Sequence, residues 1–211
     1  MKDQNPFETH YCEYDAWFDS YDKIYRSELL AVQELLPKNG NWVEIGVGSG
    51  RFASKLGIKT GVEPAEGIAT LAMKRGVTVL KGRAEELPLD DESIDAAFLI
   101  TTLCFVDELG RTFTEAFRVI RPGGAVIVAF IPQDSPFGEL YGRIAGEDRF
   151  YRLATFYTKE NVFTAMTQAG FLIDRTVQTL TGSPEQANDA VEAPTEGHAK
   201  GSFIVVRANK P

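Results

Sequence analysis

The hydrophobic positions of this chain fall into short runs separated by turn residues. Two runs, at residues 94–100 and 125–131, are apolar at nearly every position. Strands covered by helices on both faces have this continuous apolar character, whereas half-exposed strands alternate between apolar and polar residues. Neither run is long enough to span a bilayer. Both therefore indicate central strands of a parallel sheet.

Segments with helical spacing of their apolar residues alternate with apolar runs over residues 40–131. The runs predict strands at residues 42–47, 58–63, 77–81, 94–101 and 125–131. Helices are predicted between them, at residues 50–56, 65–75 and 108–120. Because strand–helix–strand units join parallel strands, the alternation predicts an α/β fold: a Rossmann-like, mostly parallel sheet with helices on both faces.

The segments on either side of this region have other patterns. Residues 1–12 predict a loose or docked tail, and residues 13–36 an amphipathic cap helix. Residues 132–157 are rich in Gly, Phe, Tyr and Arg, and predict an irregular insertion. Since this insertion starts where a strand ends, and ligands of open α/β sheets bind beyond the carboxyl ends of strands, we expect it to shape a ligand pocket.

The last part of the chain, residues 158–211, predicts a helix and a strand pair. The helix covers residues 158–169, with Thr158 as its N-cap, and the strands cover residues 171–180 and 202–207. No internal repeat and no second domain is indicated. We therefore expect residues 1–211 to form a single domain, completed by this strand pair.

Charge and cysteine content narrow the function further. The chain of 211 residues has 22 Lys and Arg against 30 Asp and Glu, a net charge of −8. An acidic chain without a basic block disfavours nucleic acid as a partner. Cys12 and Cys104 lack metal-ligand spacing, so no metal site is expected. Two distant cysteines and no apolar signal core favour a reducing cytoplasm.

The stretch VEIGVGSGRFA, from Val43 to Ala53, is the first candidate for a ligand site. Its glycines, Gly46, Gly48 and Gly50, follow a predicted strand with the spacing G-x-G-x-G. The dinucleotide fingerprint is G-x-G-x-x-G, and its third glycine would fall on Arg51. The loop therefore departs from a dinucleotide site, although a tight turn without a ligand has the same local sequence.

Two carboxylates beside this loop bear on whether its ligand carries a pyrophosphate or a positive charge. Glu44 lies two residues before Gly46, where a negative charge suits a ligand with a cationic end better than it suits a pyrophosphate. Glu63 ends the second predicted strand, where a carboxylate can accept both hydroxyls of an adenosine ribose. S-adenosylmethionine has an ammonium, a sulfonium and a ribose but no phosphate, and it fits both positions.

Four motifs in order resemble a known family. They are VEIGVGSG, GVEP, the segment GRAEELPLDDESIDAAFLITTLCFV, and EAFRVIRPGGAVIVA. Over residues 40–131 the chain resembles the class I S-adenosylmethionine-dependent methyltransferases, in particular the small enzymes similar to ubiquinone/menaquinone-biosynthesis methyltransferases. The resemblance implies a seven-stranded sheet in the order 3-2-1-4-5-7-6, with the last strand antiparallel, and S-adenosylmethionine as cofactor.

The resemblance also implies roles for the residues of the first two motifs. Glu44, Gly46, Gly48 and Gly50 would line the methionine part of the cofactor, and Glu63 would hold the ribose. These five residues are the cofactor contacts that the resemblance assigns to the first two motifs.

The later motifs imply further contacts. Pro64 would lie next to the adenine, and Ala84 and Glu85 would meet the adenine edge. Thr101 and Thr102 would face the region of methyl transfer at the end of the fourth strand.

Two expectations concern positions outside the family pattern. Arg83 stands where the family commonly has an Asp that accepts from the adenine amino group, so Glu85 or a backbone carbonyl would have to accept instead. Tyr14 and Trp17, in the predicted N-terminal helix, are the candidates for a lid over the cofactor.

The function predicted from these residues is methyl transfer to a small molecule by in-line displacement. The sulfonium is already an activated leaving group, so no catalytic acid or base is required of the sequence, and none is assigned. The aromatic and cationic groups of residues 132–157 would suit an aromatic or anionic acceptor. The alternatives are a nicotinamide-dependent oxidoreductase, a non-catalytic binder of S-adenosylmethionine or S-adenosylhomocysteine, and an aminopropyl transferase.

Overall fold

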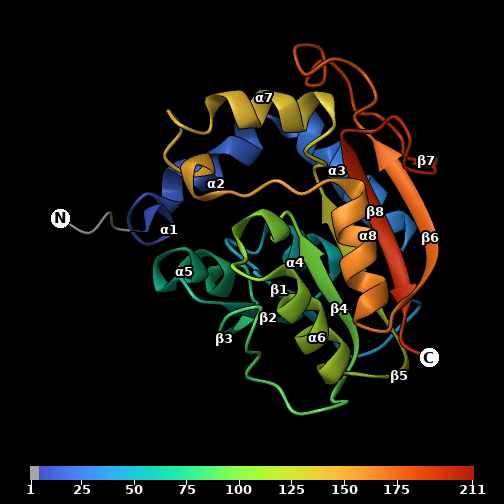
Figure 1. The fold of residues 1–211 in the computed structure, drawn as a ribbon. Helices are drawn as coiled ribbons and strands as arrows, with labels where there is room; N and C mark the ends of the chain where they lie inside the picture. The colour runs from blue at the N-terminus through green and yellow to red at the C-terminus, as the bar shows by residue number, and fades with distance from the viewer. Residues whose placement is uncertain (1–4) are drawn as a thin grey trace.

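An eight-stranded sheet forms the centre of the computed structural model, which describes residues 5–211 (Figure 1). The strand order is β3-β2-β1-β4-β5-β8-β6-β7. The strands are β1 Trp42–Ile45, β2 Thr60–Glu63, β3 Thr78–Lys81, β4 Ile94–Ile100, β5 Ile120–Phe130, β6 Leu172–Thr179, β7 Thr195–Glu196 and β8 Phe203–Asn209. Strands β1 to β5 pair in parallel, and β8 runs antiparallel to both β5 and β6.

The α/β fold class and the strand order are confirmed, with one addition to the sheet. The predicted seventh strand is β8, which lies between β5 and β6 as expected. The extra strand, β7, is a two-residue segment of the long connection over residues 181–201 and pairs with β6 at the sheet edge. The core sheet therefore has the predicted seven strands in the predicted order.

Helices cover both faces of the sheet. Alternate residues of each central strand enter different cores: Phe98 and Ile127 join one cluster, and Leu99 and Val128 the other. The first core includes residues of α3 Asp22–Glu34, α4 Arg51–Leu56, α5 Glu66–Lys74 and α7 Pro136–Ile144. The second core includes residues of α6 Leu109–Val119 and α8 Lys159–Gln168. Burial on both faces explains why β4 and residues 125–130 of β5 are almost wholly apolar.

The predicted single helix over residues 13–36 is wrong: the N-terminal segment forms three helices. They are α1 Pro6–Thr9, α2 Tyr11–Ser20 and α3. Tyr21, with φ −114° and ψ 46°, leaves the helical conformation and separates α2 from α3. Part of the predicted tail is thus helical, while residues 1–4 lie outside the described part of the chain.

The tail is docked through the carboxylate of Glu8. Its oxygens accept from the backbone N–H groups of Glu66 and Gly67, at 3.1 and 2.8 Å, where α5 begins. A carboxylate at a helix N-terminus satisfies backbone donors that have no partner within the helix. The contact is tight, because a Cβ on Gly67 would lie 2.4 Å from the carbonyl oxygen of Glu8. Helix α1 is therefore fixed over the start of α5.

The insertion over residues 132–157 is more regular than predicted. It contains α7, whose N-cap Ser135 accepts from Gly138 N, and a 3-10 turn, η2, over Tyr151–Leu153. Helices α1, α2 and α7 lie together above the sheet in Figure 1. We call α1, α2, α7 and η2 the roof. The helix predicted over residues 158–169 is confirmed as α8, with a capping box between Thr158 and Asn161.

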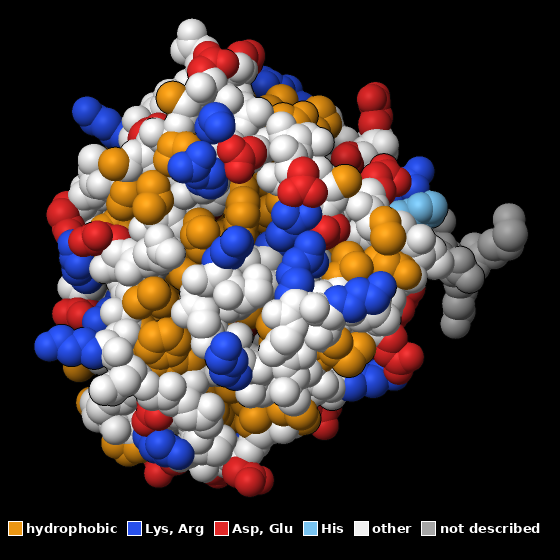
Figure 2. All heavy atoms as spheres, turned by 180° about the vertical axis from the view of Figure 1, so that it is seen from behind, with side chains coloured by type: hydrophobic (Ala, Val, Ile, Leu, Met, Phe, Trp, Pro, Cys, Tyr) orange, Lys and Arg blue, Asp and Glu red, His pale blue; other side chains and the backbone are white. Residues whose placement is uncertain are grey.

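The surface behind this view has mixed charge. Figure 2 shows acidic and basic side chains interspersed over that face, with apolar groups between them. No helix within residues 5–211 is both long enough and apolar enough to cross a bilayer.

Candidate active site

A cavity of about 420 Å³ opens where β1, β2 and β4 end, and we call it the strand-end cavity. In open α/β sheets this edge is where ligands bind. Most of the site residues predicted from the sequence border it: Tyr14, Gly46, Gly48, Glu63, Pro64, Ala84, Glu85, Thr101 and Thr102. The roof closes it from above with Asn5, Phe7, Arg152 and Leu153. Residues that are far apart in the sequence thus meet at one site.

Three predicted site residues do not border this cavity. Glu44 is buried beneath the loop of Gly46, Gly48 and Gly50, which we call the glycine loop. Burial raises the pKa of its carboxyl well above the ordinary value, although a hydrogen bond from the backbone of Ala53 acts to lower it. Its Oε2 atom has no hydrogen-bond partner in the described structure. Gly50 packs against α5 instead, and Trp17 borders a second cavity.

The glycines of the loop have different tasks. All three have positive φ, which favours glycine. A Cβ on Gly46 would lie 2.4 Å from Cγ2 of Thr102, and a Cβ on Gly50 would lie 2.9 Å from Cα of Ala72. At Gly48 the nearest atom would be 3.7 Å away, because this residue faces the cavity. Gly46 and Gly48 both border the cavity, but only at Gly48, of the three glycines, does the structure leave room for a Cβ.

Gly50 also explains why Arg51 is tolerated at the start of α4. In a dinucleotide loop, a third glycine permits close packing of the helix. Here Gly50 makes the close approach, to α5, as the left-handed N-cap of α4. Arg51 follows as the first helical residue and its side chain is directed to the roof.

Glu63 borders the strand-end cavity, and two backbone hydrogen bonds orient its carboxylate. Its oxygens accept from Gly48 N at 2.9 Å and from Ala65 N at 3.0 Å. A carboxylate has about four acceptor positions, so both oxygens keep capacity for a ligand hydroxyl. Burial raises the pKa of this group, and the two backbone hydrogen bonds oppose the shift.

Arg83, which stands where the family commonly has an Asp, borders the strand-end cavity. Arg83 forms ion pairs with the carboxylates of Glu85, at 3.6 Å, and Asp107. Glu85 also accepts from Asp107 N at 2.6 Å. Arg83, Ala84, Glu85 and Asp107 all border the cavity. The arginine thus joins the loop after β3 to the loop after β4.

A second cavity of about 420 Å³ lies beneath the roof, and we call it the aromatic cavity. Its walls come mainly from α2, from residues 101–105 after β4 and from residues 148–157, together with Glu28 of α3 and Tyr141 of α7. The rings that line it are Tyr14, Trp17, Phe18, Tyr21, Phe105, Phe130, Tyr141, Phe150, Tyr151, Phe156 and Tyr157. Of the insertion residues considered in the sequence, Tyr141, Phe150 and Tyr151 border this cavity.

The two cavities share Tyr14, Thr101 and Phe105. Tyr14 is partly buried, and desolvation raises the pKa of its hydroxyl, which therefore stays protonated. Thr101 directly follows β4 and has φ 53°, a conformation that a β-branched residue rarely adopts. Strained backbone of this kind concentrates at functional sites. The junction thus places a tyrosine hydroxyl and a strained threonine between two ligand-sized spaces.

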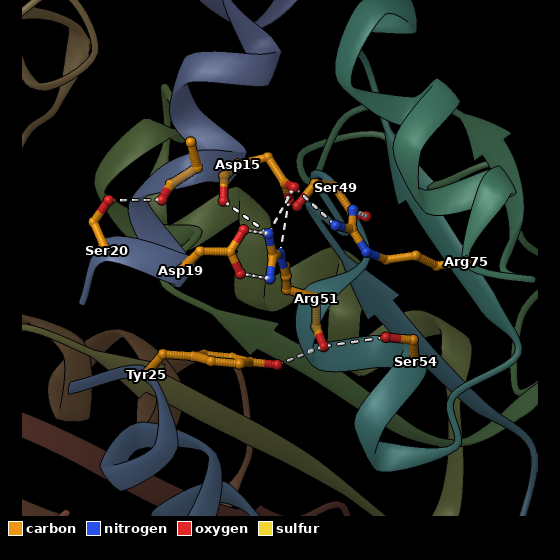
Figure 3. Close-up of polar contacts among 9 residues, drawn as sticks. Asp15, Asp19, Ser20, Tyr25, Ser49, Arg51, Ser54 and Arg75 are labelled. Carbon is orange, nitrogen blue, oxygen red and sulfur yellow. Dashed lines mark hydrogen bonds and ion pairs between the residues drawn. The ribbon is translucent and has the colours of Figure 1, made fainter. Parts of the chain in front are cut away.

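A cluster of ion pairs holds the roof to the glycine loop (Figure 3). The guanidinium of Arg51 donates to both carboxylate oxygens of Asp15, at 2.9 and 2.8 Å, and to Asp19. Arg75 donates to Asp15 at 2.8 Å and to the carbonyl of Ser49 at 2.7 Å. Two arginines from beside the loop thus converge on Asp15 of α2, next to Tyr14.

Glu28 is a site residue that the sequence reasoning missed. It is 3% exposed and borders the aromatic cavity. Burial raises its pKa to about 8. A signal was present, because Glu28 lies four residues from both Ile24 and Val32 on the apolar face of its helix. A lone carboxylate on such a face departs from the amphipathic pattern.

Comparison with known proteins gives the family. A family profile described as "Methyltransferase domain" matches residues 43–128. A crystal structure from Thermotoga maritima, described as a SAM-dependent methyltransferase and possible histamine N-methyltransferase, is 45% identical with a TM-score of 0.92. The similarity covers 97% of this chain and 98% of that one.

Two further relatives extend the range of similarity. An uncharacterised protein of Methanocaldococcus jannaschii is 36% identical over 98% of this chain and 99% of its own length. A malonyl-[acyl-carrier protein] O-methyltransferase of Methylococcus capsulatus is 29% identical, over 71% of this chain and 56% of that protein.

The chain belongs to the S-adenosylmethionine-dependent methyltransferases. It is accordingly an enzyme, and methyl transfer replaces the nicotinamide, aminopropyl and non-catalytic alternatives. The expected class I fold is also the observed one.

Proposed function

We propose that this methyltransferase binds S-adenosylmethionine in the strand-end cavity and methylates a small molecule bound in the aromatic cavity. The observation that carries the proposal is the junction at Tyr14, Thr101 and Phe105, which borders both cavities. Each cavity, at about 420 Å³, falls within the range of small-molecule sites. A donor and an acceptor in adjacent cavities can meet at this junction.

The strand-end cavity fits the cofactor by its own residues. The Glu63 carboxylate, held by Gly48 N and Ala65 N, has the acceptor capacity for two ribose hydroxyls. Gly48 has open space where a side chain would otherwise stand. When bound, S-adenosylmethionine supplies a methyl group on a positively charged sulfur, so that its transfer requires no acid to activate the leaving group.

The predicted cofactor contacts become specific proposals here. Glu63 would hold the ribose with Pro64 beside it, and Gly46 and Gly48 would form the backbone wall at the methionine part. Glu44 would act as a positioning residue, because its carboxyl accepts from the backbone of Ala53 beneath the loop and does not reach the cavity. Gly50 would support the loop through its packing against α5.

The adenine end would depend on the segment over residues 82–85. Glu85 accepts from Asp107 N, and Arg83 pairs with both carboxylates. The backbone of Ala84 and the carboxylates of Glu85 and Asp107 are the acceptors available to an amino group there. Thr102 would act indirectly, because its hydroxyl donates to Ile45 O at 3.1 Å below the loop.

The roof would confine the acceptor and exclude water. Tyr14 would separate the two ligands at the junction, while Trp17 would line the acceptor side only. Positioning and a dry site supply much of the acceleration when the leaving group is already activated. A buried hydroxyl that stays protonated, as in Tyr14, suits an orienting hydrogen bond more than it suits proton removal.

Thermal unfolding with S-adenosylhomocysteine tests the cofactor site. A ligand at about a hundred times its dissociation constant adds about 2.7 kcal/mol to the free energy of unfolding. Glu63→Ala is expected to lose this stabilisation while remaining folded. Glu66→Ala, which removes an exposed carboxylate near the same loop, is the matched control and is expected to keep it. Full stabilisation of Glu63→Ala would contradict the proposed site.

A further inference from the structure

The aromatic cavity has acidic and neutral groups in its walls but no basic ones. Its titratable residues, among those described, are Glu13, Tyr14, Tyr21, Glu28, Cys104, Tyr141, Asp148, Tyr151 and Tyr157. No Lys, Arg or His of the described part of the chain borders it. Arg143 and Arg149 of the insertion, which the sequence suggested for an anionic acceptor, lie outside this lining. The cavity is therefore poorly suited to an anion.

Two of the three carboxylates in the lining are already paired. Glu13 forms an ion pair with Arg149 at 3.0 Å. Asp148 accepts from the backbone N–H groups of Phe150 and Tyr151, at 2.8 Å each. These contacts fix the turn that leads into η2. Both carboxylates are thus accounted for by the structure of the roof.

Glu28 is the exception. Its side chain forms no hydrogen bond and no ion pair within residues 5–211, although the residue is 3% exposed. A buried carboxyl group without a partner costs free energy, so such groups normally have a polar partner or a function. Since Glu28 borders the cavity, the missing partner can be a bound molecule.

The rings around this carboxyl have the arrangement that favours a cation. Tyr141 and Tyr151 stack with their centroids 4.4 Å apart, and Trp17 and Tyr21 stack at 5.0 Å. All four line the cavity with Glu28. Aromatic faces attract ammonium groups, most strongly where water is excluded. A carboxylate combined with such faces binds a positive charge on an apolar body.

We propose that the aromatic cavity binds its acceptor as an amine, with the cationic nitrogen paired to the Glu28 carboxylate and the apolar body packed against the aromatic rings that line the cavity. The proposal rests on the proposed function, since it names the class of acceptor for the same site. The cavity volume of about 420 Å³ suits an arylalkylamine. Glu28 selects the charge of the ligand, and the rings select its shape.

Proton release gives this pairing a distinctive signature. Glu28 interacts electrostatically with Tyr14 from α2, Tyr141 from α7 and Tyr25 from its own helix, whose pKa values are raised mainly by burial. They stay neutral, so Glu28 is the group that changes charge. Burial raises its pKa to about 8, and the free carboxyl is therefore mostly protonated at neutral pH. Pairing an amine cation with it releases close to one proton.

Calorimetry on the protein saturated with S-adenosylhomocysteine tests the proposal. The probes are phenethylamine, tyramine and histamine, with phenylethanol and phenylacetate as neutral and anionic counterparts. We expect at least one amine to bind, with about one proton released at neutral pH in buffers of different ionisation enthalpy. Glu28→Gln is expected to weaken that binding at least about tenfold and to abolish the release. Glu34→Gln, on the same helix outside the cavity, is the control.

The outcomes separate the acceptor class from the cofactor site. Binding of S-adenosylhomocysteine is measured first, and a wild-type protein that does not bind it would contradict the proposed function itself. If it binds but phenylethanol or phenylacetate binds as tightly as every amine, the amine proposal is overturned. Failure of every amine to bind, or unchanged amine affinity in Glu28→Gln, overturns it as well. Should Glu28→Gln not fold, the comparison of amine with alcohol in the wild-type protein decides.

Discussion

Arg51 and Asp15 form a bidentate ion pair between the glycine loop and the roof. Both side chains are largely buried, with 17% and 14% of their surface exposed. Burial acts to raise the pKa of Asp15, but hydrogen bonds from Arg51 and Arg75 outweigh it and lower the pKa to about 2. The carboxylate therefore stays charged over the whole neutral range, and α2 stays attached to the loop.

Removing the charge of Asp15 is expected to loosen the roof. Asp15→Asn leaves two arginines without their shared partner and should lower the free energy of unfolding by about 2 kcal/mol. Amide hydrogen exchange over residues 11–20 should accelerate, and the affinity for S-adenosylhomocysteine should fall, because α2 carries Tyr14. Exchange measured by mass spectrometry checks the first effect directly.

Asp19→Asn is the control for this prediction. Asp19 pairs with the same Arg51 but is 71% exposed, where solvent screens the charge, so its loss should cost less than the loss of the Asp15 charge. Equal exchange rates over residues 11–20 in the wild-type protein and Asp15→Asn would show that the ion pair does not hold the roof.

Gly50 and Gly57 form a matched pair for testing the close packing of the loop. Both have left-handed backbone, with φ of 76° and 78°. A Cβ on Gly57 would meet nothing within 4 Å, whereas one on Gly50 would lie 2.9 Å from the backbone of Ala72. Gly57→Ala should therefore cost about 1 kcal/mol, for conformation alone, and Gly50→Ala at least about 1 kcal/mol more. Urea unfolding measures the difference, and equal costs would contradict the packing role.

The buried carboxyl of Glu28 makes a prediction about stability against pH. Its pKa is about 8 in the folded protein and 4.5 when unperturbed, so the folded state holds the proton more tightly. The corresponding stability is fully present below about pH 4.5 and is lost as the pH rises through about 8. The loss is of the order of 5 kcal/mol, since one pKa unit corresponds to about 1.4 kcal/mol.

Glu28→Gln should remove this pH dependence. The variant cannot lose a proton, so its stability relative to the wild-type protein should improve steadily from about pH 5 to about pH 9. Urea unfolding across this range measures the slope, with Glu34→Gln as the control that keeps it. A constant difference between wild-type protein and Glu28→Gln would mean that the carboxyl does not titrate as its burial implies.

The sheet could be predicted from the sequence because its central strands are short apolar runs between turn residues. Burial on both faces makes β4 and β5 recognisable from local pattern alone. The break between α2 and α3 at Tyr21 could not be predicted, since the apolar spacing continues through it. Helix α7 was also missed, because its sequence PFGELYGRI contains two glycines, which disfavour a helix, and its stability comes from the packing of Phe137 and Tyr141 into the first core.

The candidate site, like the fold, could be predicted only in part from the sequence. Glu63 and Gly48 could be identified because each lies at a fixed place after a strand. At Arg51, the sequence showed only that the third glycine of the dinucleotide fingerprint is absent. Its partners, Asp15 and Asp19, lie in another helix, and no local pattern relates them. The isolation of Glu28 likewise depends on which walls surround it in three dimensions.

A crystal structure with S-adenosylhomocysteine and an acceptor amine tests the central claim most directly. The account predicts ribose hydroxyls on the Glu63 carboxylate, the thioether sulfur beside Thr101, and the amine across Tyr14 in the aromatic cavity. The adenosine in the aromatic cavity, or an amine bound away from the junction of the two cavities, would contradict it.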